Sequence, residues 1–112
     1  MDNNVLSINN DVLAKMAGMA ALECDGVAAL SKFPAPVNKM VTGKFTRSVK
    51  VETENGLVNL EVYITVKSDR NVREIAENVQ NKVKENIQNM TGTALNRVNV
   101  VVADVELAED DA

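Results

Sequence analysis

The longest regular pattern of hydrophobic positions lies between Asn71 and Gly92. Its apolar residues recur at intervals of three and four, which places them on one face of a helix. Asn71 can accept a hydrogen bond from a first-turn amide, Glu74 can complete a capping box, and Gly92 can adopt the left-handed conformation that ends a helix. The pattern predicts an amphipathic helix whose apolar face comprises Val72, Ile75, Ala76, Val79, Val83, Ile87 and Met90.

The opposite face of this helix is polar but weakly charged, with many asparagine and glutamine residues. A solvated outer face is usual for a surface helix, and a surface that binds a partner is the alternative interpretation. The candidate interaction residues on this face are Asn78 and Asn81.

A second helix is predicted between Asn9 or Asn10, which can cap its start, and Gly26, which can end it. Small side chains dominate its apolar face, so another backbone can approach it closely. We therefore expect it to pack tightly on the sheet or on the other helix. The predicted apolar face comprises Val12, Leu13, Met16, Ala17, Ala20, Ala21 and Cys24.

The remaining apolar segments predict strands, beginning with a short one at Val5 to Ile8. Ser48 to Thr53 and Leu57 to Lys67 flank Asn55-Gly56, a dipeptide that supplies the positive φ angles of a tight hairpin. Apolar residues alternate along the second hairpin strand, so one of its faces should meet helices and the other water or a partner. Arg97 to Val105 is the last strand, and a crossover through the long helix should make it parallel to the hairpin strand.

The predicted order βαββαβ gives an α+β fold with two layers, in which both helices pack on one face of a mixed sheet. A chain of 112 residues forms one domain, which can bury about 65% of the surface of its unfolded form. We expect this domain to span residues 1–108, followed by a short acidic tail at 109–112. Two prolines and a glycine predict a loop over Lys32 to Thr46.

The formal net charge of −4 argues against nucleic-acid binding, because phosphate neutralisation needs a basic surface. A single cysteine cannot form an internal disulfide, which fits a reducing compartment such as the cytosol. The first residues lack the pattern of a signal peptide, and the apolar runs are too short for a membrane span. We predict a cytoplasmic protein without direct membrane insertion, whose membrane association depends on a partner.

The residues give no sign of catalytic chemistry. Histidine is absent, which excludes Ser-His and Cys-His catalysis and His-liganded metal sites. The glycines do not have the spacing of phosphate-binding loops, and the GXXG loop of KH domains is missing. Glu52, Glu54 and Glu61 occupy exposed strand positions, while Cys24 should behave as a small buried hydrophobe. We therefore predict that the chain is no enzyme and has no catalytic residues, no cofactor and no metal site.

Charge is distributed unevenly along the chain, since no acidic residue occurs between Asp25 and Glu52 and acidic residues crowd the end. A solvated loop and tail is one interpretation. The alternative is that the basic segment contacts an acidic surface on a neighbouring copy, a partner or anionic lipid headgroups. Its candidate interaction residues are Lys32, Lys39, Lys44, Arg47 and Lys50.

Four stretches, DVLAKMAGMAALECDGVAAL, LVNLEVYITV, REIAENVQNKVKENIQNMTG and VNVVV, together resemble the alkaline shock protein 23 family of bacterial envelope-stress proteins. The resemblance covers nearly the whole chain, and its motifs at Glu23 to Val27 and Val79 to Gly92 are specific when taken together. It implies a cytoplasmic, non-enzymatic protein that self-associates and lies near the inner face of the membrane through a membrane-anchoring partner. It supplies no catalytic or ligand-binding residue.

The residues and the resemblance together predict a scaffold or adaptor protein of cell-envelope stress homeostasis. It would act through self-association and a membrane-anchored partner. A regulatory module that binds a lipid-metabolism enzyme is the alternative, and an enzyme that uses carboxylates is the least favoured hypothesis.

Overall fold

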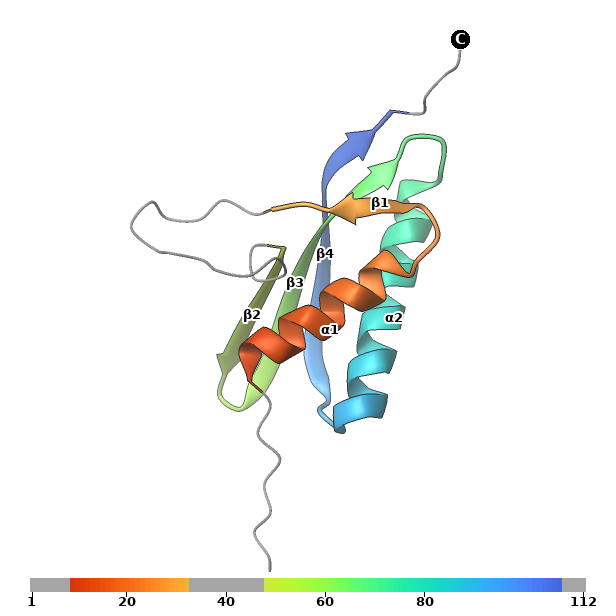
Figure 1. Ribbon diagram of the computed structural model, residues 1–112. Helices are drawn as coiled ribbons and strands as arrows, with labels where there is room; N and C mark the ends of the chain where they lie inside the picture. Colours follow the sequence, from red (N-terminus) through yellow and green to blue (C-terminus); the bar gives the residue numbers. More distant parts are fainter. Residues whose placement is uncertain (1–8, 33–47, 108–112) are drawn as a thin grey trace, which may run out of the picture.

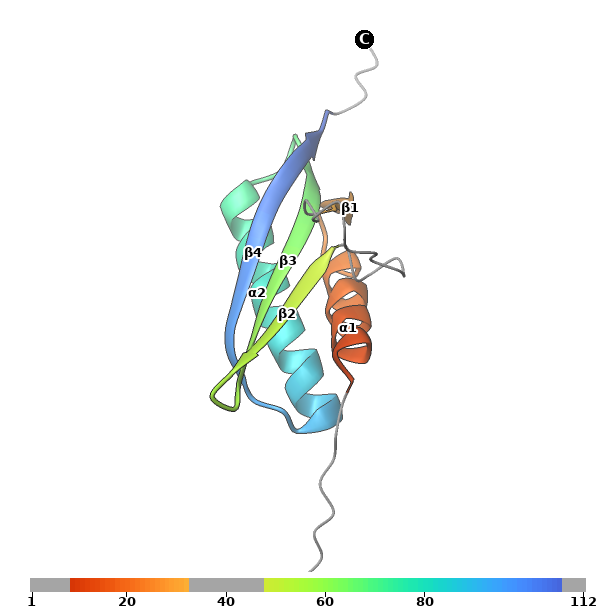
Figure 2. The ribbon, with the colours of Figure 1, turned by 90° about the vertical axis from the view of Figure 1, so that its left-hand side faces the viewer.

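The computed structural model describes residues 9–32 and 48–107, which form a layer of two helices against one face of a sheet (Figures 1 and 2). The predicted α+β class with two layers is confirmed. The elements in chain order are α1 (Asn10–Leu22), β1 (Val27–Leu30), β2 (Val49–Glu54), β3 (Leu57–Lys67), α2 (Val72–Thr91) and β4 (Leu95–Glu106).

Strand β3 is the centre of the sheet. β2 pairs antiparallel with its first half, from Glu54 opposite Leu57 to Val49 opposite Val62. β1 pairs antiparallel with its second half, and β4 runs parallel to it. The predicted mixed sheet, with β4 parallel to β3, is therefore confirmed.

Local signals account for the hairpin and for both ends of α2. Asn55 and Gly56 have φ angles of 54° and 79°, which are the positive values that a two-residue hairpin turn needs. The Asn71 side chain accepts a hydrogen bond of 3.0 Å from the Glu74 amide. Gly92 ends the helix with a φ angle of 75°. The predicted hairpin turn and the predicted boundaries of α2 are confirmed.

The core lies between the sheet and the two helices. Alternate residues of β3, including Leu60, Val62 and Ile64, are buried on the side that faces the helices, as the alternating pattern predicted. On α2 the buried residues are Ile75, Val79, Val83 and Ile87.

Two residues of the predicted apolar face of α2 are exposed. Val72 is 40% exposed and Met90 is 72% exposed, so the apolar face extends beyond the core. Both have the correct angular position on the helix, but they lie in its first and last turns, at the margins of the core.

Helix α1 packs closely against α2 and the sheet, as its small residues predicted. Ala17, Gly18 and Ala21 are among its buried residues. Val12, however, is 47% exposed, which corrects its assignment to the packed face. The helix ends at Leu22, earlier than predicted, and Gly26 makes the turn into β1 with a φ angle of 94°.

Strand β1 was not predicted from the sequence. It has only four residues, too few for a clear period, and its pairing with distant residues of β3 defines it. The predicted strand at residues 5–8 and most of the predicted loop at 32–46 lie outside the described residues.

Candidate interaction surfaces

The predicted interaction residues fall into separate groups. Lys39, Lys44 and Arg47 lie outside the described residues. Lys32 is exposed just after β1, and Lys50 is exposed on β2 opposite Glu61 of β3. Asn78 and Asn81 are exposed on α2 and line a different surface. The described members of the two predicted sets, Lys32 and Lys50 on one side and Asn78 and Asn81 on the other, therefore lie on different surfaces.

The basic segment begins and ends beside one residue of the central strand. The backbone carbonyl of Tyr63 accepts a hydrogen bond of 2.9 Å from the Ser31 amide, and its amide donates one of 2.8 Å to the Ser48 carbonyl. The N–H and C=O groups of one strand residue point to the same side, so β1 and β2 lie end to end along one edge of β3. This arrangement fixes both ends of the segment that carries the predicted basic residues.

Tyr63 also lies on the sheet face opposite the helices. Its hydroxyl donates a hydrogen bond of 2.8 Å to Glu61 Oε1. This hydrogen bond is the main cause that raises the pKa of Tyr63, because it stabilises the protonated phenol, and desolvation and the charge of Glu61 add to it. Tyr63 is therefore a hydrogen-bond donor on an otherwise polar, partly exposed surface.

A polar hollow of about 320 Å³ lies between the end of α1 and the middle of α2. Lys82 Nζ lies 3.7 Å from Glu23 Oε1 across it. Asn78 and Asn81 line this hollow, so the two predicted residues of α2 do share a surface. The hollow is lined by Glu23, Cys24, Asp25, Asn78, Asn81, Lys82 and Glu85.

Cys24 lies half-buried at the inner side of the polar hollow, and its thiol donates a hydrogen bond of 3.6 Å to the Ala20 carbonyl. Burial raises the pKa of this thiol, while Lys82 acts in the opposite direction and Glu23 adds to the increase. A raised pKa keeps the sulfur protonated at neutral pH, and the thiolate is the reactive form. The arrangement therefore makes Cys24 a weak nucleophile.

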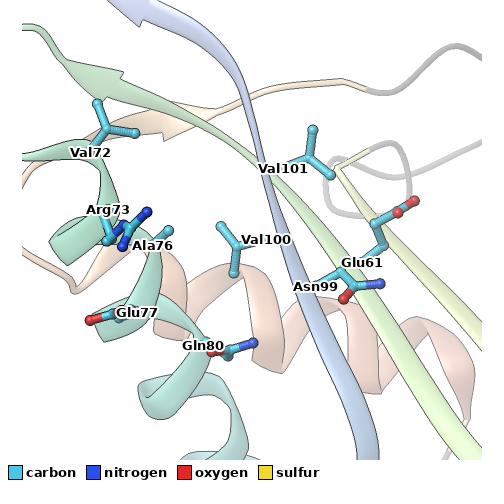
Figure 3. A pocket seen from close by; sticks show the side chains of 9 residues that line it. All are labelled: Glu61, Val72, Arg73, Ala76, Glu77, Gln80, Asn99, Val100 and Val101. Carbon is cyan, nitrogen blue, oxygen red and sulfur yellow. The ribbon is translucent and has the colours of Figure 1, made fainter.

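A second hollow, which we call the edge groove, lies between the first half of α2 and the outer edge of β4 (Figure 3). Its volume is about 560 Å³. Val100 points towards α2, whereas Val101 and Glu61 lie on the other side of β4 (Figure 3), so the groove follows the strand edge. It is lined by Glu61, Val72, Arg73, Ala76, Glu77, Gln80, Asn99, Val100 and Val101.

The backbone of β4 is accessible from this groove. Gln80 Nε2 donates a hydrogen bond of 2.7 Å to the Val98 carbonyl, which shows that the backbone of Val98 points away from β3. Alternate strand residues point the same way, so the backbone groups of Val100 and Val102 also point outward. Within residues 9–32 and 48–107, β4 pairs with β3 alone.

The sequence analysis missed the edge groove. The position of Ala76 and Val72 on the apolar face of α2 was predicted, but not the hollow that they line. The groove could have been predicted from the last strand. A strand that a single crossover places next to the hairpin strand pairs on one side and keeps an outer edge on the other.

Two further properties concern metals and membranes. Among the described residues, no group of three or more Cys, Asp or Glu side chains has an arrangement that could hold a metal ion. No helix in the described part of the chain has both the length and the apolar character to cross a membrane.

Comparisons with known proteins point to one family. The sequence model of the alkaline shock protein 23 family, described as having a cell envelope-related function, matches residues 1–107. The protein YloU of Bacillus subtilis is 32% identical over 110 residues, which cover 91% of this chain and 88% of YloU. A second Bacillus subtilis protein, YqhY, is 28% identical over 106 residues, covering 90% of this chain and 76% of YqhY.

Solved structures with a similar fold include variants of the MamM CTD. One has a TM-score of 0.61 at 16% sequence identity and covers 94% of this chain and 92% of its own length. Another has a TM-score of 0.57 at 16% identity and covers 90% and 96%. At this level of identity the similarity concerns the fold alone.

Proposed function

This chain belongs to the alkaline shock protein 23 family, and we propose that it is a non-enzymatic cytoplasmic scaffold or adaptor protein of cell-envelope stress homeostasis. In this proposal the chain acts through self-association and through a membrane-anchored protein partner. The cell envelope-related function of the family supports the envelope setting. The stress setting and the membrane-anchored partner come from the resemblance described above.

The observation that carries the adaptor proposal is the open edge of β4 in the edge groove. A sheet edge presents main-chain donors and acceptors to which an extended segment of another protein can add as a further strand. The hydrogen bond from Gln80 to the Val98 carbonyl indicates that this edge already accepts a donor from outside the sheet. A partner strand would make the same kind of contact at Val100 and Val102.

The side chains around the edge define the kind of segment that fits. Val72, Ala76 and Val100 form an apolar floor, and Arg73 and Glu77 place one charge of each sign on the rim. An extended segment with an apolar side chain towards this floor and polar residues on both flanks matches that lining. Main-chain pairing would supply affinity, and the apolar contact would supply specificity.

A comparison of two helix variants tests the proposal in cells that produce the tagged full-length chain. Ala76→Arg introduces a long charged side chain into the edge groove, whereas Gln88→Arg adds the same side chain at an exposed position of the same helix that lines neither hollow. After cross-linking and separate purification from membrane and soluble fractions, the wild type and Gln88→Arg should recover a membrane-anchored protein. Ala76→Arg should lose most of it while retaining the wild-type melting temperature.

Other outcomes would change the proposal in defined ways. Equal recovery with Ala76→Arg would move the partner site away from the edge groove. Recovery of a soluble lipid-metabolism enzyme alone, with neither a membrane-anchored protein nor a second copy of the chain, would favour the regulatory module.

A further inference from the structure

The outward side of α1 carries an apolar stripe. Val12, Met19 and Leu22 are 47%, 50% and 44% exposed, and Met16 is partly buried beside them. We call these four residues the α1 stripe. They recur at intervals of three and four, so they lie on one side of the helix.

The opposite side of α1 is already packed against α2 and the sheet, with Leu13, Ala17 and Ala21 buried there. Between residues 12 and 22, the exposed or partly buried positions comprise the stripe and Lys15 only. A helix that is apolar all round is normally covered all round. Figures 1 and 2 show α1 in the helix layer, and no other described element covers the side of α1 that faces away from the sheet.

The charged residues beside the stripe would pair with the same residues of a second copy. Lys15 lies about one turn before Met19 and Glu23 lies about one turn after it. Glu23 Oε1 is 3.7 Å from Lys82 Nζ, but the Glu23 side chain remains 58% exposed. If a second copy packs antiparallel with its two-fold axis at Met19, Lys15 of each copy is level with Glu23 of the other.

We propose that the α1 stripe is the contact face of a homodimer in which two α1 helices pack antiparallel around Met19. This interface is isologous, because the same patch of both copies forms it. The inference rests on the self-association in the proposed function and adds the surface and the geometry. The stripe is about 15 Å long, so the dimer belongs to the class of small, weak and concentration-dependent interfaces.

A lipid surface fits this stripe less well. Helices that bind anionic membranes carry lysine and arginine beside their apolar face. Here Lys15 is the one basic residue of α1 itself, and the acidic Glu23 and Asp25 at its end pair with Lys82 and Arg70. The charge around α1 is therefore mixed and not basic, which favours a partner that supplies both signs, as a second copy does, over anionic headgroups.

Matched methionine variants test the position of the interface. Met19→Glu places a charge at the centre of the stripe, and Met90→Glu makes the same change at a residue of α2 that is 72% exposed. Sedimentation equilibrium of the full chain from about 10 μM to 1 mM covers the range expected of a weak interface. Met19→Glu should weaken the dimer by at least about tenfold, and Met90→Glu should leave the dissociation constant unchanged.

Charge reversal tests the antiparallel geometry. Lys15→Glu alone gives two repulsive glutamate pairs in a homodimer, and Glu23→Lys alone gives two repulsive lysine pairs. An equimolar mixture of the two variants restores both opposite-charge pairs in a heterodimer. Each variant alone should therefore dimerise more weakly than wild type, and the mixture should regain the wild-type affinity.

The outcomes separate this inference from the broader proposal. Self-association that is equally strong in Met19→Glu and Met90→Glu would overturn the α1 interface and leave self-association intact. A mixture no stronger than the single charge variants would overturn the antiparallel arrangement. A wild-type chain that is monomeric throughout would overturn both the α1 dimer and self-association, while the Ala76→Arg experiment would still test partner binding independently.

Discussion

Gly26 and Ile75 are in direct contact where the turn before β1 passes under the start of α2. A Cβ atom at Gly26 would lie 2.6 Å from Ile75 Cδ1 and 2.7 Å from Ile75 Cγ1. Ile75 is only 4% exposed, so its side chain has little space into which it can move. The absence of a side chain at residue 26 therefore allows the turn and the helix to pack together.

Gly26→Ala should destabilise the protein more than Gly56→Ala. Both glycines have positive φ angles, but a Cβ atom at Gly56 would meet nothing within 4 Å. The left-handed conformation costs about 1–2 kcal/mol in each variant, and overpacking against Ile75 adds about 1–3 kcal/mol in Gly26→Ala alone. Urea unfolding measures both losses, and equal values would show that the contact with Ile75 is easily relieved.

Val83→Asp and Ile87→Asp should each unfold the domain. Both residues are fully buried on α2, and an unpaired charge in the core costs several kcal/mol. The matched controls Asn78→Asp and Asn81→Asp change exposed positions of the same helix and should stay within about 0.5 kcal/mol of wild type. Thermal melting followed by circular dichroism distinguishes the two pairs, and wild-type melting of Val83→Asp would contradict the observed packing of α2.

Gln80→Ala should weaken the attachment of α2 to the edge of β4. The variant removes the hydrogen bond of 2.7 Å to the Val98 carbonyl, which should lower the free energy of unfolding by about 1 kcal/mol. Gln88→Ala is the control, because Gln88 is exposed on the same helix. Denaturant unfolding should detect the difference, and identical midpoints for the two variants would indicate that water replaces the Gln80 amide at no cost.

Cys24 should react with iodoacetamide more slowly than a small free thiol at the same pH. Burial raises the pKa of Cys24, and Lys82 opposes this increase. Lys82→Ala should therefore raise the pKa further and slow alkylation near pH 8, whereas Lys84→Ala should have no such effect. The pH dependence of the alkylation rate gives the result, and faster alkylation in Lys82→Ala would contradict the assigned influence of Lys82.

The same raised pKa has a consequence for stability. The folded chain holds the Cys24 proton more tightly than the unfolded chain, so this contribution is complete below the ordinary thiol pKa of about 8.5. It is lost as the pH rises through the higher pKa of the folded state. Cys24→Ser should therefore show a smaller loss of stability than wild type when both are titrated above pH 8.5.

The sequence by itself determined the features that depend on near neighbours. Asn55-Gly56 specified the hairpin turn because these residues adopt positive φ angles readily. Asn71 and Gly92 specified the ends of α2 because their side chain and backbone satisfy groups within the same helix. The alternation along β3 and the period of α2 specified which faces are buried, and hence the α+β class with two layers.

Only the tertiary structure decided the features that depend on contacts between distant segments. Strand β1 exists because Val27–Leu30 pairs with the second half of β3. A pattern of four residues is too short to predict that pairing. The edge groove and the exposure of Val72 and Met90 likewise depend on how far α2 extends over the sheet. Periodicity gives the direction of a side chain around its helix axis, whereas burial also requires a neighbouring element at that position along the axis.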